Sequence, residues 1–324
     1  MKHLTILVPE GEGNNLSSIA GAYKIFTRAN DYWKRKYTKE KFKIQLAGTR
    51  AKVRFYDGLF SVQPHINIAD VRKTDLIIIP SLNHNYEASV KRNQSMADWI
   101  KKQYEKGAEV ASICTGAFLL ASAGILDGKS CSTHWSAAED LKQKFPEIDV
   151  RMDKVITDET GIYTNGGAYS FLNLLIYLIE KYYDRETAIY CAKVFQIELD
   201  RKSQLSFMIF KGQKQHRDDL VRQAQEYIEH HPHEKISIED LSSRLAVGRR
   251  NFDRRFIKAT GDTPLGYSQR VKIESAKRAL ENSLKTVNEV MYEVGYSDAK
   301  AFREVFRRIT GLSPAEYKNK YNKD

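Results

Sequence analysis

The sequence predicts two domains of different class, an N-terminal α/β sandwich and a C-terminal all-α domain. In the first half, apolar strand-like runs alternate with longer segments of helical period. This alternation is typical of a Rossmann-like parallel sheet covered by helices. Beyond residue 218 the strand-like runs stop, and short amphipathic segments with turn residues between them follow. A length of 324 residues also favours two domains over one.

Four runs predict strands of the first domain: HLTILV, FKIQLAG, DLIIIP and EVASI, at 3–8, 42–48, 75–80 and 109–113. We interpret the N-terminal run as a first strand rather than a secretory signal. The two later runs suit central strands that are buried on both faces. Between them, residues 89–107 have helical period.

The segment GIYTNGGAYSFLNLLIYLIEKYY at 161–183 predicts a short strand, a glycine turn and a helix with one apolar side, which closes the α/β domain. Residues 185–210 predict a further helix, and the polar run KGQKQHRDD that follows predicts a linker. We therefore expect a first domain at 1–184, a coupling helix and linker at 185–217, and a second domain at 218–324.

Composition narrows the class of protein. No apolar stretch approaches the roughly 20 residues that span a bilayer, so we expect a cytoplasmic protein with no membrane partner. Cys114, Cys131 and Cys191 lack metal-ligand spacing and suggest no disulfide framework, and we expect no metal and no cofactor. The net charge of +11 favours a polyanionic partner.

The second half contains a repeat. NFDRRFIKATGDTPLGYSQR at 251–270 and AFREVFRRITGLSPAEYKNK at 301–320 align without a gap. The identical positions are Phe252/Phe302, Phe256/Phe306, Thr260/Thr310, Gly261/Gly311, Pro264/Pro314 and Tyr267/Tyr317. Phenylalanines four residues apart share one helical face, so they are predicted core residues, and the Thr-Gly pair supplies a helix stop.

Each copy follows another short helix and a glycine-containing turn, in ISIEDLSSRLAVG and TVNEVMYEVGYSD. Helix, short turn, helix is the helix-turn-helix unit, whose second helix enters the DNA major groove. The segment 249–258 carries five basic residues against one acid, which suits phosphate neutralisation and guanine readout. A charge run alone is usually a solvated helix face, but the tandem arrangement favours DNA.

The candidate DNA contacts are the polar and basic residues that lie off the phenylalanine face of the two second helices. They are Arg249, Arg250, Asn251, Arg254, Arg255 and Lys258 in the first copy, and Lys300, Arg303 and Arg307 in the second.

Residues 218–324 resemble the DNA-binding unit of the AraC/XylS family of bacterial transcription regulators. RVKIESAKRAL from 270 is similar to the helix that joins the family's two helix-turn-helices, and EVGYSDAKAFREVFRRITGLSPAEYK is similar to its second motif. The resemblance implies that the recognition helices enter successive major-groove segments. The first motif departs from the family pattern, with Gly248 where a capping serine is common.

The stretch EVASICTGAFLLASAG at 109–124 places Cys114 where a buried strand is predicted to meet a helix. In α/β folds ligands and nucleophiles lie at such crevices, and a helix N-terminus lowers the pKa of a thiol. We therefore expect the sulfur to face a crevice and to be partly reactive. The alternative is a small apolar residue packed at a turn.

SICTGAFLLASAGILDGKSCSTHW and YTNGGAYSFLNLLIYLIE resemble the PfpI-like, glutamine-amidotransferase-like domain that precedes the helix-turn-helix unit in GlxA-type AraC regulators. In catalytic members of that superfamily, a histidine follows the cysteine and a carboxylate faces it. Here Thr115 follows, and Ser17 and Ser18 stand where the acid is expected. Glu10 and Glu12 are nearby in sequence but poorly spaced, and His134 is a candidate base or pocket wall.

We therefore expect a transcription regulator and no catalytic residue. Its first domain would bind a small effector or dimerise, and the candidate effector pocket is formed by Cys114, Thr115, Gly116, His134 and Trp135. The expected partners are double-stranded promoter DNA, a small-molecule effector, a second copy of the chain and RNA polymerase. One rival is a thiol-dependent hydrolase or amidase that uses Cys114 and carries a DNA-binding appendage. Another is a first domain that serves only as a dimer scaffold.

Overall fold

The computed structural model describes residues 1–11, 13–82, 85–214 and 216–322, and the chain divides into two compact units, Met1–Gln204 and Leu205–Asp324. This division differs from the expected boundaries at 184 and 217. Helix α7 (Arg185–Phe195) packs on α1 (Leu16–Tyr37) and α6 (Phe171–Tyr182), so it belongs to the first unit. The predicted helix over 185–210 is wrong beyond 195, because Gln196 adopts a left-handed backbone and ends α7.

The first unit is built on a seven-stranded sheet of order β10-β11-β7-β6-β1-β2-β5. All neighbours are parallel except the edge pair β10 and β11. The four predicted strands are present. The strands of this sheet are β1 (Lys2–Val8), β2 (Phe42–Gly48), β5 (Ile66–Asn67), β6 (Leu76–Ile79), β7 (Glu109–Ile113), β10 (Ile156–Glu159) and β11 (Ile162–Asn165).

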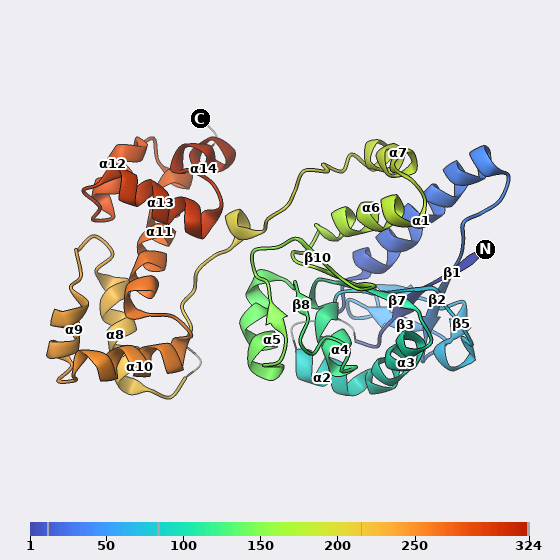
Figure 1. The fold of residues 1–324 in the computed structure, drawn as a ribbon, viewed down its shortest axis with the longest axis horizontal. Coiled ribbons are helices and arrows are strands. Elements are labelled where there is room, and N and C mark those ends of the chain that lie inside the picture. Colours follow the sequence, from blue (N-terminus) through green and yellow to red (C-terminus); the bar gives the residue numbers. More distant parts are fainter. Residues whose placement is uncertain (12, 83–84, 215, 323–324) are drawn as a thin grey trace. The chain divides into compact units, whose positions relative to one another are not determined.

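Helices cover both faces of this sheet (Figure 1). One face packs on α1, α6 and α7, and the other on α2 (Tyr86–Arg92), α3 (Gln94–Glu105) and α4 (Ala117–Ser122). The predicted helical segment 89–107 is two helices, because the Asn93 side chain donates to the Glu10 and Ser89 carbonyls where they meet. The fold is therefore the predicted α/β sandwich.

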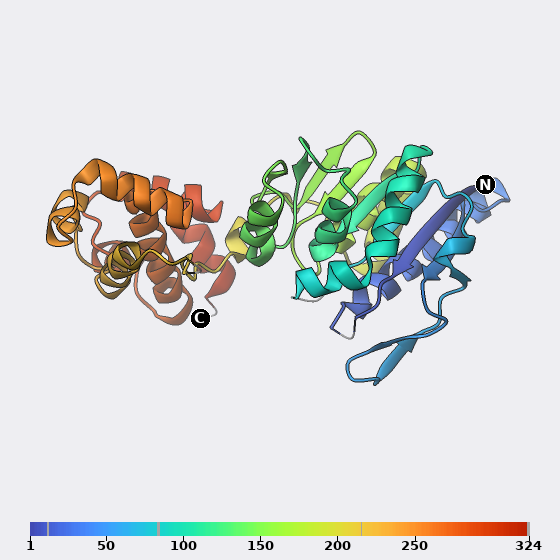
Figure 2. The ribbon, with the colours of Figure 1, turned by 90° about the horizontal axis from the view of Figure 1, so that it is seen from below.

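Smaller elements complete the first unit. Strands β3 (Val53–Phe55) and β4 (Phe60–Val62) form a hairpin that projects from it (Figure 2). Strands β8 (Ser130–Cys131) and β9 (Asp149–Val150) form a short parallel pair. Helix α5 (Ala138–Lys144) connects them in sequence and packs on β9.

The second unit is helical, as predicted. Its helices are α8 (Asp219–His230), α9 (Ile238–Arg244), α10 (Arg249–Thr260), α11 (Pro264–Asn282), α12 (Val287–Glu293), α13 (Ala299–Thr310) and α14 (Pro314–Tyr321). Each copy of the repeat has its own core, one around Phe252 and Phe256 and one around Phe302 and Phe306. The long helix α11 contributes to both cores. None of the helices in the described residues is long and apolar enough to cross a bilayer.

A buried lysine on α11 joins the two helix-turn-helix units. The Lys272 ammonium donates to the Glu234 carbonyl at 2.8 Å, in the loop before α9, and to the Val294 carbonyl at 2.9 Å, at the end of α12. Burial lowers the pKa of Lys272. Gly295, with φ 73°, lies against the same loop, and a Cβ there would be 2.3 Å from the His233 carbonyl oxygen. The turn of the second helix-turn-helix thus packs directly on the loop before α9 of the first helix-turn-helix.

The turn glycines give a stability prediction. Gly261 and Gly295 both have φ 73°, but a Cβ on Gly261 would meet nothing within 4 Å. Gly261→Ala should therefore cost about 1 kcal/mol of unfolding free energy, from backbone strain alone. Gly295→Ala adds a backbone collision and should cost about 3 kcal/mol. Calorimetry of the full chain, with the two units' transitions resolved, measures the difference; equal losses would contradict the close approach.

Candidate nucleic-acid interface and effector site

The two second helices, α10 and α13, have the geometry of paired recognition helices. Each has 12 residues, buries phenylalanines on one side and ends at a left-handed glycine, Gly261 or Gly311. Most of the predicted DNA contacts are exposed on the other side. These are Arg250, Asn251, Arg254, Lys258, Lys300, Arg303 and Arg307.

Two of the predicted DNA contacts, Arg249 and Arg255, are not free for DNA. Acids within the same unit engage their guanidinium groups. Arg249 pairs with Asp253 one turn along α10 at 2.9 Å and lies 3.5 Å from Glu239 of α9. Arg255 donates two hydrogen bonds to Asp218, at 2.9 and 2.7 Å. This pairing lowers the pKa of Asp218, which is also the N-cap of α8. Both arginines thus hold α10 against its neighbours.

The helix starts of the two motifs also differ. Asp298 caps α13 by accepting hydrogen bonds from the backbone N–H groups of Lys300 and Ala301. Gly248 occupies the same place before α10 and offers no side chain. The departure from the family pattern at Gly248 therefore leaves the first turn of α10 without a side-chain cap.

Residues 205–214, which we call the strap, lie across the helices of the second unit. The Ser206 carbonyl accepts from the Tyr321 hydroxyl at 3.1 Å, and the Met208 carbonyl accepts from the Lys277 ammonium at 2.5 Å. The Phe210 backbone N–H donates to Glu274 at 3.2 Å. Lys277 and Glu274 are themselves a buried ion pair at 2.7 Å on α11. Part of the expected linker is therefore an integral layer of this unit.

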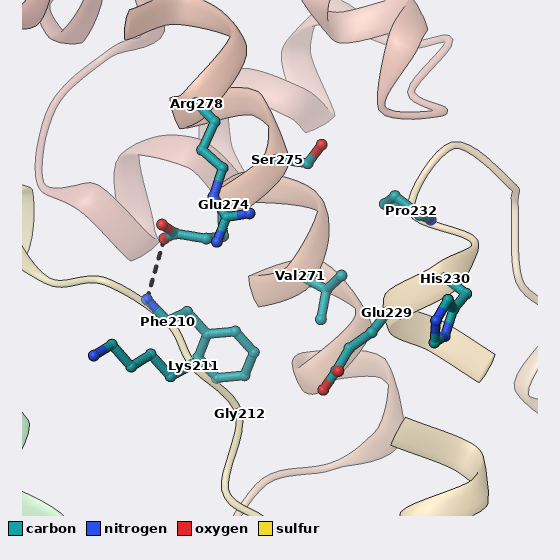
Figure 3. Close-up of a pocket in the computed structure, with 10 residues that line it drawn as sticks. All are labelled: Phe210, Lys211, Gly212, Glu229, His230, Pro232, Val271, Glu274, Ser275 and Arg278. Atoms are coloured by element: carbon teal, nitrogen blue, oxygen red, sulfur yellow. Dashed lines mark hydrogen bonds between the residues drawn. The ribbon is translucent and has the colours of Figure 1, made fainter. Parts of the chain in front are cut away.

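A cavity of about 510 Å³ lies beside the strap. Figure 3 shows its walls, contributed by the strap, the end of α8 and one face of α11. The lining residues are Phe210, Lys211, Gly212, Glu229, His230, Pro232, Val271, Glu274, Ser275 and Arg278. Sequence reasoning missed this cavity because its walls come from three separate segments with no shared motif.

The Cys114 elbow lies at the carboxyl end of β7, one strand away from the point between β1 and β6 where the strand order reverses. Strand β1 pairs with β2 on one side and β6 on the other, and β7 follows β6. Cys114 comes directly after β7, has φ 54° and begins a 3-10 turn that leads into α4. A Cβ on Gly116 would be 2.7 Å from the Pro80 carbonyl oxygen, so only glycine fits there. The predicted strand-to-helix turn is present, and it is strained.

The thiol itself is enclosed, so the expectation of a crevice-facing, polarised sulfur is wrong. Cys114 is 5% exposed and belongs to the core under α1 and α6. Burial raises the pKa of Cys114, although hydrogen bonds from Ser81, Thr115 and the His134 backbone act in the opposite direction. Desolvation of the thiolate outweighs these donors because α1 and α6 exclude water.

Residues at the expected acid position tie the loops together. The Ser18 hydroxyl accepts from the Ser81 backbone N–H at 3.2 Å, and the Ser81 and Thr115 hydroxyls are 2.8 Å apart. The Glu10 carboxylate accepts a hydrogen bond from the Thr49 hydroxyl at 2.7 Å, so its partner is Thr49 rather than the Cys114 thiol. Glu12 lies outside the described residues. The positions at which the resemblance leads us to expect catalytic groups thus carry hydroxyl bridges here.

The two segments expected to form an effector pocket do come together. The Thr133 hydroxyl donates to the Cys114 carbonyl at 3.0 Å, which brings His134 and Trp135 to the elbow. His134 is partly exposed, and its Nδ1 lies 2.7 Å from the Ser136 hydroxyl. The Trp135 backbone N–H donates to Gln204 at 3.2 Å.

Cys131 and Cys191 are free and buried. Within the described ranges, no group of three or more His, Cys, Asp or Glu residues could hold a metal.

Two family comparisons match the two units. Residues 22–181 match the DJ-1/PfpI family, and residues 241–320 match a helix-turn-helix domain. Among solved structures, the AraC family transcriptional regulator of Pseudomonas putida superposes with a TM-score of 0.51 at 15% identity, over 60% of this chain and 100% of that one. DJ-1beta of Drosophila melanogaster gives 0.51 at 19% identity, over 61% and 98%. These likenesses establish the fold of the first unit.

Curated relatives cover both units. The HTH-type transcriptional regulator GbdR of Pseudomonas aeruginosa is 23% identical over 266 residues, 80% of this chain and 70% of its own length. The HTH-type transcriptional regulator GlxA of Rhizobium meliloti is 26% identical over 227 residues, 66% of each chain.

The enclosure of the elbow predicts slow thiol chemistry. In the folded full chain, Cys114 should react with iodoacetamide about tenfold or more slowly than in the urea-unfolded chain, because the reactive thiolate is disfavoured. Because burial raises the pKa of Cys114, the rate of its reaction with iodoacetamide should continue to increase with pH above the ordinary thiol pKa. Mass spectrometry resolves each site, and Cys131, whose pKa burial raises to about 12, is the control. A folded Cys114 as reactive as the unfolded one would contradict the enclosure.

Proposed function

This chain unites a DJ-1/PfpI domain with an AraC-type helix-turn-helix domain in the manner of HTH-type transcriptional regulators, and we propose that it controls transcription through an effector-responsive first unit. The DNA-binding assignment is carried by one observation: two matching helices, α10 and α13, each presenting exposed basic residues opposite a buried phenylalanine face. Promoter DNA is the polyanion that this charge suits.

We assign the DNA contacts to the exposed residues of the two helices and leave out Arg249 and Arg255. Arginine and lysine side chains free of intramolecular acids can neutralise phosphates or donate to guanine, whereas a paired guanidinium must first give up its partner. The proposed contacts are Arg250, Asn251, Arg254, Lys258, Lys300, Arg303 and Arg307.

The proposed effector site is the junction of residues 114–116 with 134–135. Supporting it are its place at the carboxyl ends of the strands, one strand away from the point where the strand order reverses, and the partial exposure of His134 and Trp135. The strained turn at Cys114 also suits a nucleophile, which keeps a thiol hydrolase or amidase as the second candidate. Burial of the thiol argues for the sensor. Multiple turnovers in an amidase or esterase screen, lost in Cys114→Ser, would reverse this choice.

A second copy of the chain and RNA polymerase are the proposed protein partners. Symmetric dimers are the usual soluble oligomer, and two chains on DNA would double the number of phosphate contacts. Sedimentation of the full chain at micromolar concentration tests this: a monomer both with and without DNA would contradict it. We place the protein in the cytoplasm, where promoter DNA lies in bacteria.

Two neighbouring arginines test the DNA interface. At a site selected by the full chain, Arg254→Ala should cost about 1–3 kcal/mol of binding free energy and relax base preference at one position. Arg255→Ala is the matched control on the same helix. Since Asp218 already engages that guanidinium, its loss should leave base preference and the salt dependence of binding unchanged. Gel-shift titrations at several salt concentrations measure both; equal effects of the two variants would contradict the assignment.

A further inference from the structure

The two recognition helices can be compared position by position. They align with no gap at an offset of 50 residues, and both end at a left-handed glycine after the same buried phenylalanines. In this register Arg250 corresponds to Lys300, but Arg254 corresponds to Glu304, an acid. The predicted contact Arg303 instead corresponds to Asp253. The second helix therefore does not repeat the charge pattern of the first.

Glu304 is exposed in the middle of a basic helix face. Lys300 and Arg308 lie one turn to either side of it, and Arg303 and Arg307 are also near in sequence. Within the described residues, none of the salt bridges at 4 Å or less involves its carboxylate. It is also too far from the start of α13 to stabilise the helix N-terminus, where Asp298 already serves.

Several other acids of this unit have structural partners. Asp253 pairs with Arg249, Asp262 with Arg270 and Glu293 with Lys285. Glu289 and Glu316 complete capping boxes at the starts of α12 and α14. In the part of the chain that the structure describes, the Glu304 carboxylate forms no salt bridge and caps no helix.

A carboxylate on a DNA-facing helix is repelled by phosphates, so it is tolerated best where it accepts a hydrogen bond from a base. In the major groove the amino group of cytosine is the donor that Glu accepts from, whereas Arg donates to guanine. The exposed Arg254 guanidinium donates to the Asn251 side chain at 3.0 Å, so the two predicted contacts are neighbours on the same face of α10. The equivalent of Asn251 in the second helix is Ala301.

We propose that Glu304 is a specificity-determining residue that reads cytosine in the second half-site, at the position equivalent to the guanine read by Arg254 in the first. This inference rests on the proposed DNA-binding function. The two half-sites for one chain then differ in sequence, although the helices that read them are copies of one unit.

The test is selection of duplexes from a random library by the full chain, with Glu304→Arg, Glu304→Gln and Arg307→Ala compared with the unchanged protein. Glu, Gln and Arg are all good helix formers on an exposed face, so the fold should be retained. The selected base should change from cytosine to guanine in Glu304→Arg and to adenine in Glu304→Gln, with the first half-site unaltered. Discrimination at that position should be about 5- to 150-fold.

Arg307→Ala is the control for a general electrostatic effect, and it should lower binding to all sequences without changing the selected base. If Glu304→Arg selects the same bases as the unchanged protein, the inference is overturned while the DNA-binding function stands. If the unchanged protein binds DNA but enriches no sequence, both the inference about Glu304 and the proposed sequence-specific function are contradicted. The result for the unchanged protein alone therefore distinguishes the two failures.

Discussion

The buried ammonium of Lys272 is the constraint on which the DNA-binding unit depends. A buried charge without partners is costly, and here its two carbonyl partners come one from each helix-turn-helix unit. Separating the two helix-turn-helices would leave the Lys272 ammonium without its carbonyl partners. Two small cores, each too limited to be strongly stable alone, thereby act as one body, and the placement of α10 relative to α13 is set by packing within this unit.

The first unit has a strained turn at the end of β7, and hydroxyl groups rather than a carboxylate or imidazole surround it. Cys114 retains the strained backbone at the end of β7, which an enzyme uses to present a nucleophile. The neighbouring positions carry Ser18, Ser81 and Thr115, whose hydroxyls join the loops to one another. Such bridges fix the turn without supplying a base, which is the physical reason for our proposal of recognition rather than turnover at this site.

Sequence reasoning succeeded where the signal is local and periodic. The strands, the repeat and its phenylalanine cores follow from apolar spacing. It failed where the deciding partner is distant: Asp218, which captures Arg255, lies 37 residues away, and the helices that enclose Cys114 come from both ends of the first unit. The end of α7 at Gln196 carries no glycine or proline to mark it. Glu304 stands out in the sequence only when the two helices are aligned at an offset of 50 residues, because it then corresponds to Arg254.

The strap limits how regulators of this kind can exchange parts during evolution. A recombination junction placed at the start of α8 would separate Lys277 and Glu274 from the Met208 and Phe210 backbone groups that they bind, and would remove the Ser206 carbonyl from Tyr321. A junction before Leu205 transfers the strap with its helices. The heritable module is therefore longer than the helix-turn-helix motif, and chimaeric regulators should inherit these ten residues from the donor of the DNA-binding domain.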